Sequence, residues 1–378
     1  MARAPREMTV EDVPEADRLG AFPHPRHTEA FYGHAAAEAQ LATGLASGKL
    51  HHAWLLVGPE GIGKATLGYR FARAALSGIG GDVALFGDVP DKLSVDPDSR
   101  ASHLVRALSH PDLLVIRRPY DIKAKRFKTA ITVDEVRRLR DFLGHKQTGD
   151  GWKVVIVDCA DDLNVNAANA LLKSLEEPPS GAIFLLMSSM PGRLLTTIRS
   201  RCRQLNMLPL EHMALRQAAE QALQQSDQQL PSETQWPLLL QSAEGSVANL
   251  LSLASDDGMM LSKKVDQVFG SLVRTDWPAI HQLSDEFSAV SGAEKFNAFI
   301  DLLLGRLART VRAAATGAGE SVDLETASRV GVQADLASWA ELWETLVREK
   351  AMLGALNLDR KAFVLDCVMR LSRLAVRG

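Results

Sequence analysis

The chain has 378 residues, of which 46% are hydrophobic, 24% charged and 6% aromatic. These values are typical of a globular protein with two or three domains. The formal net charge of -3 excludes a globally basic nucleic-acid-binding protein, so any contact with DNA must come from a local patch.

The three cysteines are scattered along the chain. They favour a reduced, cytoplasmic compartment over a disulfide framework or a zinc cluster. No run of about 18 apolar residues occurs, so no membrane span is predicted. Residues 1–24 mix acids and bases and are predicted to form a flexible N-terminal tail.

In the first half, short apolar runs alternate with helical patterns, which is typical of a parallel sheet with helices on both faces. The predicted strands are 54–57, 113–116, 154–157, 183–187 and, more weakly, 204–207. Helices are predicted over 65–76 and 166–177, and another behind a capping box that begins at Thr132. We therefore expect an α/β domain with a five-stranded parallel sheet.

The first strand leads into a glycine-rich segment, 58–64, that matches the phosphate-binding pattern G-x-x-x-x-G-K. In this pattern the glycines let backbone N–H groups turn toward phosphates, the lysine neutralises phosphate oxygens, and a following Ser or Thr binds Mg²⁺. Here Ala65 replaces that hydroxyl residue. Thr66 lies one position late, which rotates its side chain by about 100° around the helix.

The third strand ends in Asp158, where an aspartate would hold Mg²⁺ through water. Cys159 follows, where a glutamate would activate the attacking water. Asp161 and Asp162 are displaced by more than proton transfer tolerates. The sequence thus predicts a degenerate nucleotide site without a metal, formed by Gly58, Gly61, Gly63, Lys64, Ala65, Thr66 and Asp158. It is compatible with an empty loop and with static binding of ATP or ADP.

From about residue 210 the strand pattern disappears. Apolar residues then follow helical spacing, with continuous stripes over 296–311, 339–347 and 363–371. Such stripes are typical of core-forming helices.

Two segments resemble the bacterial clamp-loader branch of the AAA+ ATPases. They are 169–179, NALLKSLEEPP, and 197–202, TIRSRC, whose Ser-Arg-Cys triplet is the hallmark of that branch. The resemblance covers roughly residues 25–210. Within the branch, the chain resembles the subunit type that does not hydrolyse ATP. Ala65 stands in place of the Ser or Thr and Cys159 in place of the glutamate, and a gamma/tau-type subunit would keep both of those residues.

The resemblance implies a RecA-like AAA+ domain at 25–208, a helical lid domain at 209–272 and an all-α collar domain at 273–378. It also implies a five-subunit ring with gamma/tau and delta clamp-loader subunits. This ring would load the beta sliding clamp onto primed DNA as part of the DNA polymerase III holoenzyme, a DNA-directed DNA polymerase. The competing hypothesis is an active loader ATPase, or a related DNA motor, that uses Lys64 and Asp158.

Arg201 of the Ser-Arg-Cys triplet resembles an arginine finger, which would reach the γ-phosphate of ATP bound by a neighbouring subunit. The alternative is an arginine that pairs with a carboxylate at the start of a strand. Arg199 and Arg203 alternate with it, so on a strand all three would share one face.

Two departures from the family pattern matter. Ala248 stands about where an ATP-contacting arginine of the lid would be found. The family's four-cysteine zinc module is absent from 77–109, so no zinc is predicted, and 78–105 is expected to be an irregular insertion. The basic stretch 117–140 has two interpretations, a DNA-phosphate track and a solvated surface.

Overall fold

The computed structural model describes residues 14–78, 92–124, 126–145, 151–288, 292–319, 321–356 and 359–377. The chain divides into two compact units, one ending at Leu251 and the other beginning at Ser252. Each unit is described by itself.

The first unit is built on a five-stranded sheet in the order β2-β5-β6-β1-β7, and every pairing in it is parallel. Its strands are β1 (Ala53–Val57), β2 (Leu113–Ile116), β5 (Lys153–Val157), β6 (Ala182–Ser188) and β7 (Arg203–Asn206). Each lies within one residue of a predicted apolar run. The runs of β5, β6 and β1 are fully apolar because these central strands are buried on both faces, whereas the weaker run belongs to the edge strand β7.

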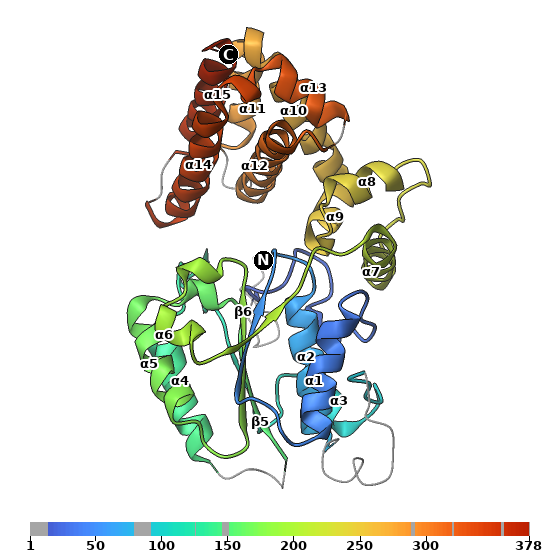
Figure 1. The fold of residues 1–378 in the computed structure, drawn as a ribbon, viewed down its shortest axis with the longest axis vertical. Helices are drawn as coiled ribbons and strands as arrows, with labels where there is room; N and C mark the ends of the chain where they lie inside the picture. Colours follow the sequence, from blue (N-terminus) through green and yellow to red (C-terminus); the bar gives the residue numbers. More distant parts are fainter. Residues whose placement is uncertain are drawn as a thin grey trace, which may run out of the picture. The chain divides into compact units, whose positions relative to one another are not determined.

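Helices cover both faces of this sheet (Figure 1). The helices α1 (Ala35–Ala46) and α2 (Lys64–Leu76) share one apolar core with Trp54 and Leu56 of β1. The helices α4 (Val133–Gly144) and α5 (Val165–Glu176) share the other core with Leu55. This alternation along β1 follows from the period of two in a strand. The predicted α/β fold class is therefore confirmed.

Shorter elements complete this unit. They are α3 (Arg100–Arg106), the hairpin of β3 (Tyr120–Asp121) and β4 (Arg126–Phe127), α6 (Thr196–Arg199), α7 (His212–Gln225), α8 (Trp236–Ser242) and the start of α9 (Val247–Ala254). The prediction that 78–105 is an irregular insertion was wrong at its C-terminal end, where α3 forms. Ser99 Oγ accepts a hydrogen bond from Ser102 N and caps this helix. Residues 79–91 lie outside the described residues.

The described residues of the second unit form helices joined by short loops, without a strand. Its helices are α10 (Asp256–Ser271), α11 (Trp277–Glu286), α12 (Ala293–Thr316), α13 (Ser321–Arg329), α14 (Leu336–Leu356) and α15 (Arg360–Arg377). Residues of all three predicted stripes lie in its single apolar core. The division into domains at 208 and 272 stays a prediction. Among the residues that the structure describes, no helix is both long and apolar enough to cross a membrane.

Two local predictions were wrong. Residues 14–24, expected to be part of a flexible tail, fold against the body of the unit: Asp17 is only 5% exposed and pairs with Arg117 and His24. Residues 1–13 lie outside the described residues. The helix behind Thr132 begins where predicted, but the Thr132 side chain makes no capping hydrogen bond.

Candidate functional site: a degenerate nucleotide pocket

The glycine loop connects β1 to α2 and takes a conformation that its glycines permit. Gly61 has φ +75° and Gly63 has φ +106°, in the left-handed region that side chains disfavour. Gly58 is needed for a different reason, since a Cβ there would lie 2.3 Å from the carbonyl oxygen of Met207. The predicted strand–loop–helix arrangement is therefore present.

Lys64 lies at the first position of α2 and is 9% exposed. Its Nζ donates hydrogen bonds to Gly58 O at 2.7 Å, Pro59 O at 2.6 Å and Ser189 Oγ at 2.9 Å. All three acceptors are neutral. Burial lowers the pKa of Lys64, and the nearby acidic groups, first Cys159 and then Glu60, oppose that shift.

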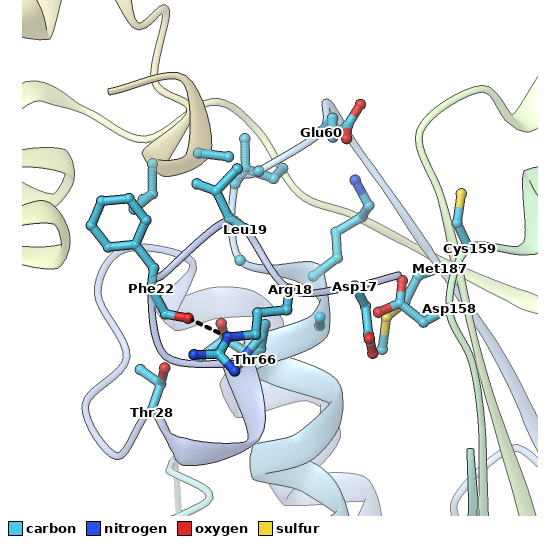
Figure 2. Close-up of a pocket in the computed structure, with 18 of the residues that line it drawn as sticks. Asp17, Arg18, Leu19, Phe22, Thr28, Glu60, Thr66, Asp158, Cys159 and Met187 are labelled. Atoms are coloured by element: carbon cyan, nitrogen blue, oxygen red, sulfur yellow. Dashed lines mark hydrogen bonds between the residues drawn. The ribbon is translucent and has the colours of Figure 1, made fainter. Parts of the chain in front are cut away.

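The two residues after Lys64 do not restore the missing metal ligand. Ala65 and Thr66 both line the cavity beside the loop. Figure 2 shows Thr66 near Arg18 and Thr28 of the N-terminal segment, whereas Asp158 lies apart from it. Because Thr66 stands one residue later than the pattern requires, its hydroxyl faces a different wall of the cavity, as the sequence predicts.

Asp158 directly follows β5 in a half-buried position next to Asp17, on the side of the pocket opposite Thr66 in Figure 2. Burial first, and then the charge of Asp17, raise the pKa of Asp158 to about 7, although Lys64 acts in the opposite direction. A carboxyl group with this pKa is largely protonated below neutral pH. It is therefore a weaker metal ligand than an ordinary aspartate.

Cys159 stands where the catalytic base would be, and its thiol is unreactive. Its Sγ donates to Asp161 Oδ2 at 3.2 Å, and burial raises the pKa of the thiol far above its ordinary range. A thiol with a raised pKa is a poor nucleophile and a poor base. The structure therefore offers no substitute for glutamate at this position.

The carboxylate of Asp161 is hydrogen-bonded to residues at and just after the end of β6. Its carboxylate accepts hydrogen bonds from Ser188 Oγ at 2.5 Å, Ser189 N at 2.6 Å and Met190 N at 3.2 Å. Asp162 pairs with Arg118 at 2.8 Å. Both carboxylates thus hold structure together, which agrees with the expectation that neither acts as the base.

The walls of the pocket come from parts of the chain that the motif does not contain. A cavity of about 490 Å³ is lined by the loop, by residues of the N-terminal segment between Ala16 and Tyr32, and by residues of α7 and α9. Sequence reasoning missed the N-terminal wall. Its only signal was the pair of apolar residues, Leu19 and Phe22, within an otherwise polar segment.

The start of α9 is hydrogen-bonded directly to the glycine loop. Gly61 O accepts from Val247 N at 2.9 Å, and Ser246 Oγ donates to Glu60 O at 2.9 Å. A Cβ added at Gly61 would lie 2.4 Å from Ala248 Cβ. The residue predicted to replace the lid arginine therefore does lie at the phosphate loop.

The donor set fits phosphate better than a metal. Within the described ranges, no group of three or more His, Cys, Asp or Glu side chains could hold a metal ion. Loop amides, the N-terminus of α2 and Lys64 are the groups that bind phosphate oxygens in such loops. With alanine after Lys64, this pocket lacks the hydroxyl that would bind Mg²⁺.

Arg201 lies outside this cavity, in the turn between α6 and β7. Its Nη2 is 2.8 Å from Glu176 Oε1, and Nη1 donates to Thr197 O at 3.0 Å. The prediction that three arginines share a strand face was wrong, because Arg199 ends α6 and only Arg203 lies on β7. Arg203 instead stacks over Trp54, 4.9 Å from the ring centroid.

Ion pairs occupy much of the basic stretch 117–140. Arg117 pairs with Glu15 and Asp17, and Arg118 with Asp162. Arg137 and Arg138 pair with acids one helical turn earlier. Lys125 lies outside the described residues. Paired guanidinium groups favour the interpretation of a solvated surface over a DNA track.

The fold and the site together define a P-loop α/β domain with a degenerate nucleotide pocket. The family described as "DNA polymerase III, delta subunit" matches residues 33–211. The DNA polymerase III subunit delta' of Pseudomonas aeruginosa is 40% identical over 153 residues, which are 40% of this chain and 42% of that protein. The tau subunit of Escherichia coli is 32% identical over 238 residues, 61% of this chain and 34% of that protein.

The delta' subunit of Escherichia coli is 27% identical over 347 residues, which cover 90% of this chain and 94% of that protein. The first two alignments thus span less than half the length of the relatives, whereas this one spans nearly all of it. The predicted resemblance to bacterial delta' subunits of DNA polymerase III is confirmed.

Proposed function

We propose that this chain is a delta'-type subunit of a bacterial clamp loader and that it does not hydrolyse ATP itself. The observation that carries the second part is the pair of replacements at the pocket. Ala65 leaves no hydroxyl for Mg²⁺, and the Cys159 thiol donates a hydrogen bond to Asp161 at the position where a base should accept a proton. Hydrolysis requires both the metal and an oriented water.

The role in the assembly is proposed from similarity. Partners would be gamma/tau and delta subunits in a five-membered ring, and the ring would place the beta sliding clamp on primed DNA during replication in the cytoplasm. This chain would then act as a rigid stator. The hydrogen bonds from Ser246 and Val247 to the glycine loop support rigidity, because they hold α9 to the loop by protein contacts alone.

Arg201 is the group that we propose acts on ATP bound by a neighbour. Its side chain is 36% exposed and belongs to the Ser-Arg-Cys triplet. Arg201 is not among the residues that line the cavity of its own chain. A guanidinium in this place would stabilise charge that develops on the γ-phosphate of the neighbouring subunit's ATP.

The competing proposal, an active gamma/tau-like ATPase, has support from the 32% identity to the Escherichia coli tau subunit over 238 residues, but the alignment with the Escherichia coli delta' subunit is longer, at 347 residues. It requires Lys64 and Asp158 to work without the hydroxyl and without the base. The environment of Asp158, half-buried beside the Asp17 carboxylate, weakens that proposal further.

Reconstitution tests both parts. The chain is mixed with gamma/tau and delta subunits, and assembly and DNA-stimulated ATP hydrolysis are measured for wild type, Arg201→Ala, Arg201→Lys and the surface control Lys49→Ala. We expect all four to assemble. Arg201→Ala should lose about 10³-fold in turnover at one ATP site, and Arg201→Lys should stay impaired because lysine lacks the planar fork.

Failure to assemble would overturn the proposed role in the ring. Full turnover by Arg201→Ala rings would overturn the arginine finger alone. ATP hydrolysis by the isolated chain, lost in Lys64→Ala, would favour the active-ATPase alternative.

A further inference from the structure

The second unit carries an exposed apolar patch where the chain enters α11 and where α15 ends. Among the described residues of this unit, five large apolar side chains are exposed, and three of them lie here: Val273 at 45%, Trp277 at 38% and Val376 at 66%. The structure describes all six tryptophans of the chain, and only Trp277 is exposed. Single exposed apolar side chains are ordinary, but three at one place indicate a contact surface.

A hydrogen bond brings the two parts of this patch together across 97 residues of sequence. Thr275 Oγ1 donates to Ser372 Oγ at 2.8 Å, and Figure 1 shows α11 beside the C-terminal end of α15. Val273 and Trp277 lie on either side of Thr275 in the sequence, and Val376 lies one helical turn after Ser372. The three exposed side chains therefore belong to one surface.

The patch rests on the packed core of the unit. Leu272, Leu371 and Ala375, which adjoin its residues in sequence, are buried in that core. Side chains that a packed core holds in place lose little further freedom when a partner binds. The patch is thus prepared for binding without a rearrangement of the fold.

Two arginines lie within the same patch. Arg274 is in the turn before α11 and Arg373 is on α15, and both are exposed and make no ion pair within the described part of the chain. The nearby Asp276 caps α11, and its carboxylate accepts a hydrogen bond from Ala279 N. The surface therefore combines apolar side chains with positive charge that the described residues do not neutralise.

We infer that the Trp277 patch, made of Val273, Arg274, Trp277, Arg373 and Val376, binds an acidic amphipathic helix of a partner protein. The apolar face of such a helix covers the tryptophan and the valines, and carboxylates at its edges pair with the two guanidinium groups. Tryptophan and arginine are also the residues that most often dominate the binding energy of protein interfaces. Nucleic acid fits less well, because valines offer no flat ring for base stacking and such interfaces are more polar.

Fluorescence anisotropy of a labelled peptide tests the inference on the full chain. The probe is a synthetic helix of about 18 residues with leucine at every third or fourth position and glutamate elsewhere, and its control has lysine in place of each glutamate. The acidic peptide should bind at least about tenfold more tightly than the basic one. Trp277→Ala and the double variant Arg274→Glu/Arg373→Glu should each weaken its binding at least about tenfold. The exposed controls Met260→Ala and Lys263→Glu should bind like wild type.

Equal binding of the two peptides would overturn the inference, and so would the absence of binding by the wild type or acidic-peptide binding that survives in either patch variant. Oligodeoxythymidine that binds more tightly than the acidic peptide, and is lost in the same variants, would assign the patch to nucleic acid instead. The arginine variant changes only exposed side chains, so it decides the matter even if Trp277→Ala fails to fold.

Ring reconstitution with the same variants is a separate readout. The patch contains none of the residues on which the proposed function rests, so we expect the variants to assemble like wild type. Loss of assembly would overturn the inference, because the patch would then be a contact within the ring. Failure of the wild type to assemble would overturn the proposed function and leave the peptide result unaffected.

Discussion

The guanidinium of Arg201 lies 2.8 Å from the carboxylate of Glu176 and so joins the turn before β7 to the end of α5. The two side chains are 36% and 46% exposed. Ion pairs with this exposure contribute about 0–1 kcal/mol, since water screens them. Arg201 can therefore leave Glu176 and bind a phosphate at a subunit interface with little loss of folding free energy.

We predict that Glu176→Gln and Arg201→Ala each change the free energy of unfolding of the isolated chain by less than about 1 kcal/mol. Denaturant titration of both variants and of the double variant measures the pair directly. In reconstituted rings, Glu176→Gln should keep turnover that Arg201→Ala loses. A loss of stability above about 2 kcal/mol would mean that Arg201 is mainly structural.

The contact between the glycine loop and α9 predicts a different effect for Gly61→Ala. The new Cβ would lie 2.4 Å from both Ala248 Cβ and Ser246 Oγ, at a residue with φ +75°. We expect about 2–4 kcal/mol of destabilisation, from overpacking and backbone strain together. Gly48→Ala is the matched control, because Gly48 has φ +64° and open space around it, so only about 1 kcal/mol of strain applies.

Hydrogen exchange locates the effect. The amides of Val247 and Ala248 donate to Gly61 O, at 2.9 and 3.4 Å. They should exchange faster in Gly61→Ala than in Gly48→Ala. Equal exchange in the two variants would show that α9 does not depend on the loop.

Asp158 predicts a pH dependence of stability. Its pKa is about 7 in the folded chain, raised from 3.8 by burial and then by Asp17. Between these values the folded state keeps a proton that the unfolded state has released. The contribution of Asp158 to stability is therefore full below pH 3.8 and is lost as the pH rises through about 7.

Asp158→Asn removes this proton-linked term. Urea titrations over that pH range should show a smaller fall of the unfolding free energy with rising pH in Asp158→Asn than in wild type. Parallel curves for the two proteins would contradict the pKa of Asp158.

The strands and the phosphate loop were predictable because their signals are local. Four apolar runs and one weaker run, 204–207, marked the strands, and the spacing of Gly58, Gly63 and Lys64 marked the loop. The same spacing also revealed the missing hydroxyl at Ala65. Chemistry that depends on neighbours in sequence can thus be predicted from the sequence.

The walls of the pocket were not predictable for the opposite reason. Arg117 binds Asp17 across 100 residues of sequence, and Ser246 binds Glu60 across 186. Arg117 was part of a basic run and Asp17 part of a polar tail, so neither side chain indicated its partner. Arg199 lies at the end of the short helix α6, which stops before β7 begins, so the alternation expected of a strand does not apply to it.

The pair of Asp17 and Arg117 gives the last prediction. Asp17 is 5% exposed and its two oxygens bind Arg117 at 2.5 Å and His24 at 2.8 Å. Burial alone would raise the pKa of Asp17, but the hydrogen bond and charge of His24, followed by the charge of Arg117, lower it. The ionised form is thus stabilised in the fold, and this stability is lost as the pH falls below 3.8 toward the folded value.

Asp17→Asn removes the charged partner of His24 and leaves Arg117, among the described residues, with Glu15 as its acidic partner, and we expect a loss of about 3 kcal/mol, the lower end of the range for a broken buried pair. Asp134→Asn is the matched control, since its pair with Arg137 has exposures of 75% and 72% and should contribute less than about 1 kcal/mol. Denaturant unfolding measures both. If the two variants lost equal stability, the N-terminal segment would not be anchored by this pair, and its role as a wall of the pocket would lose its main support.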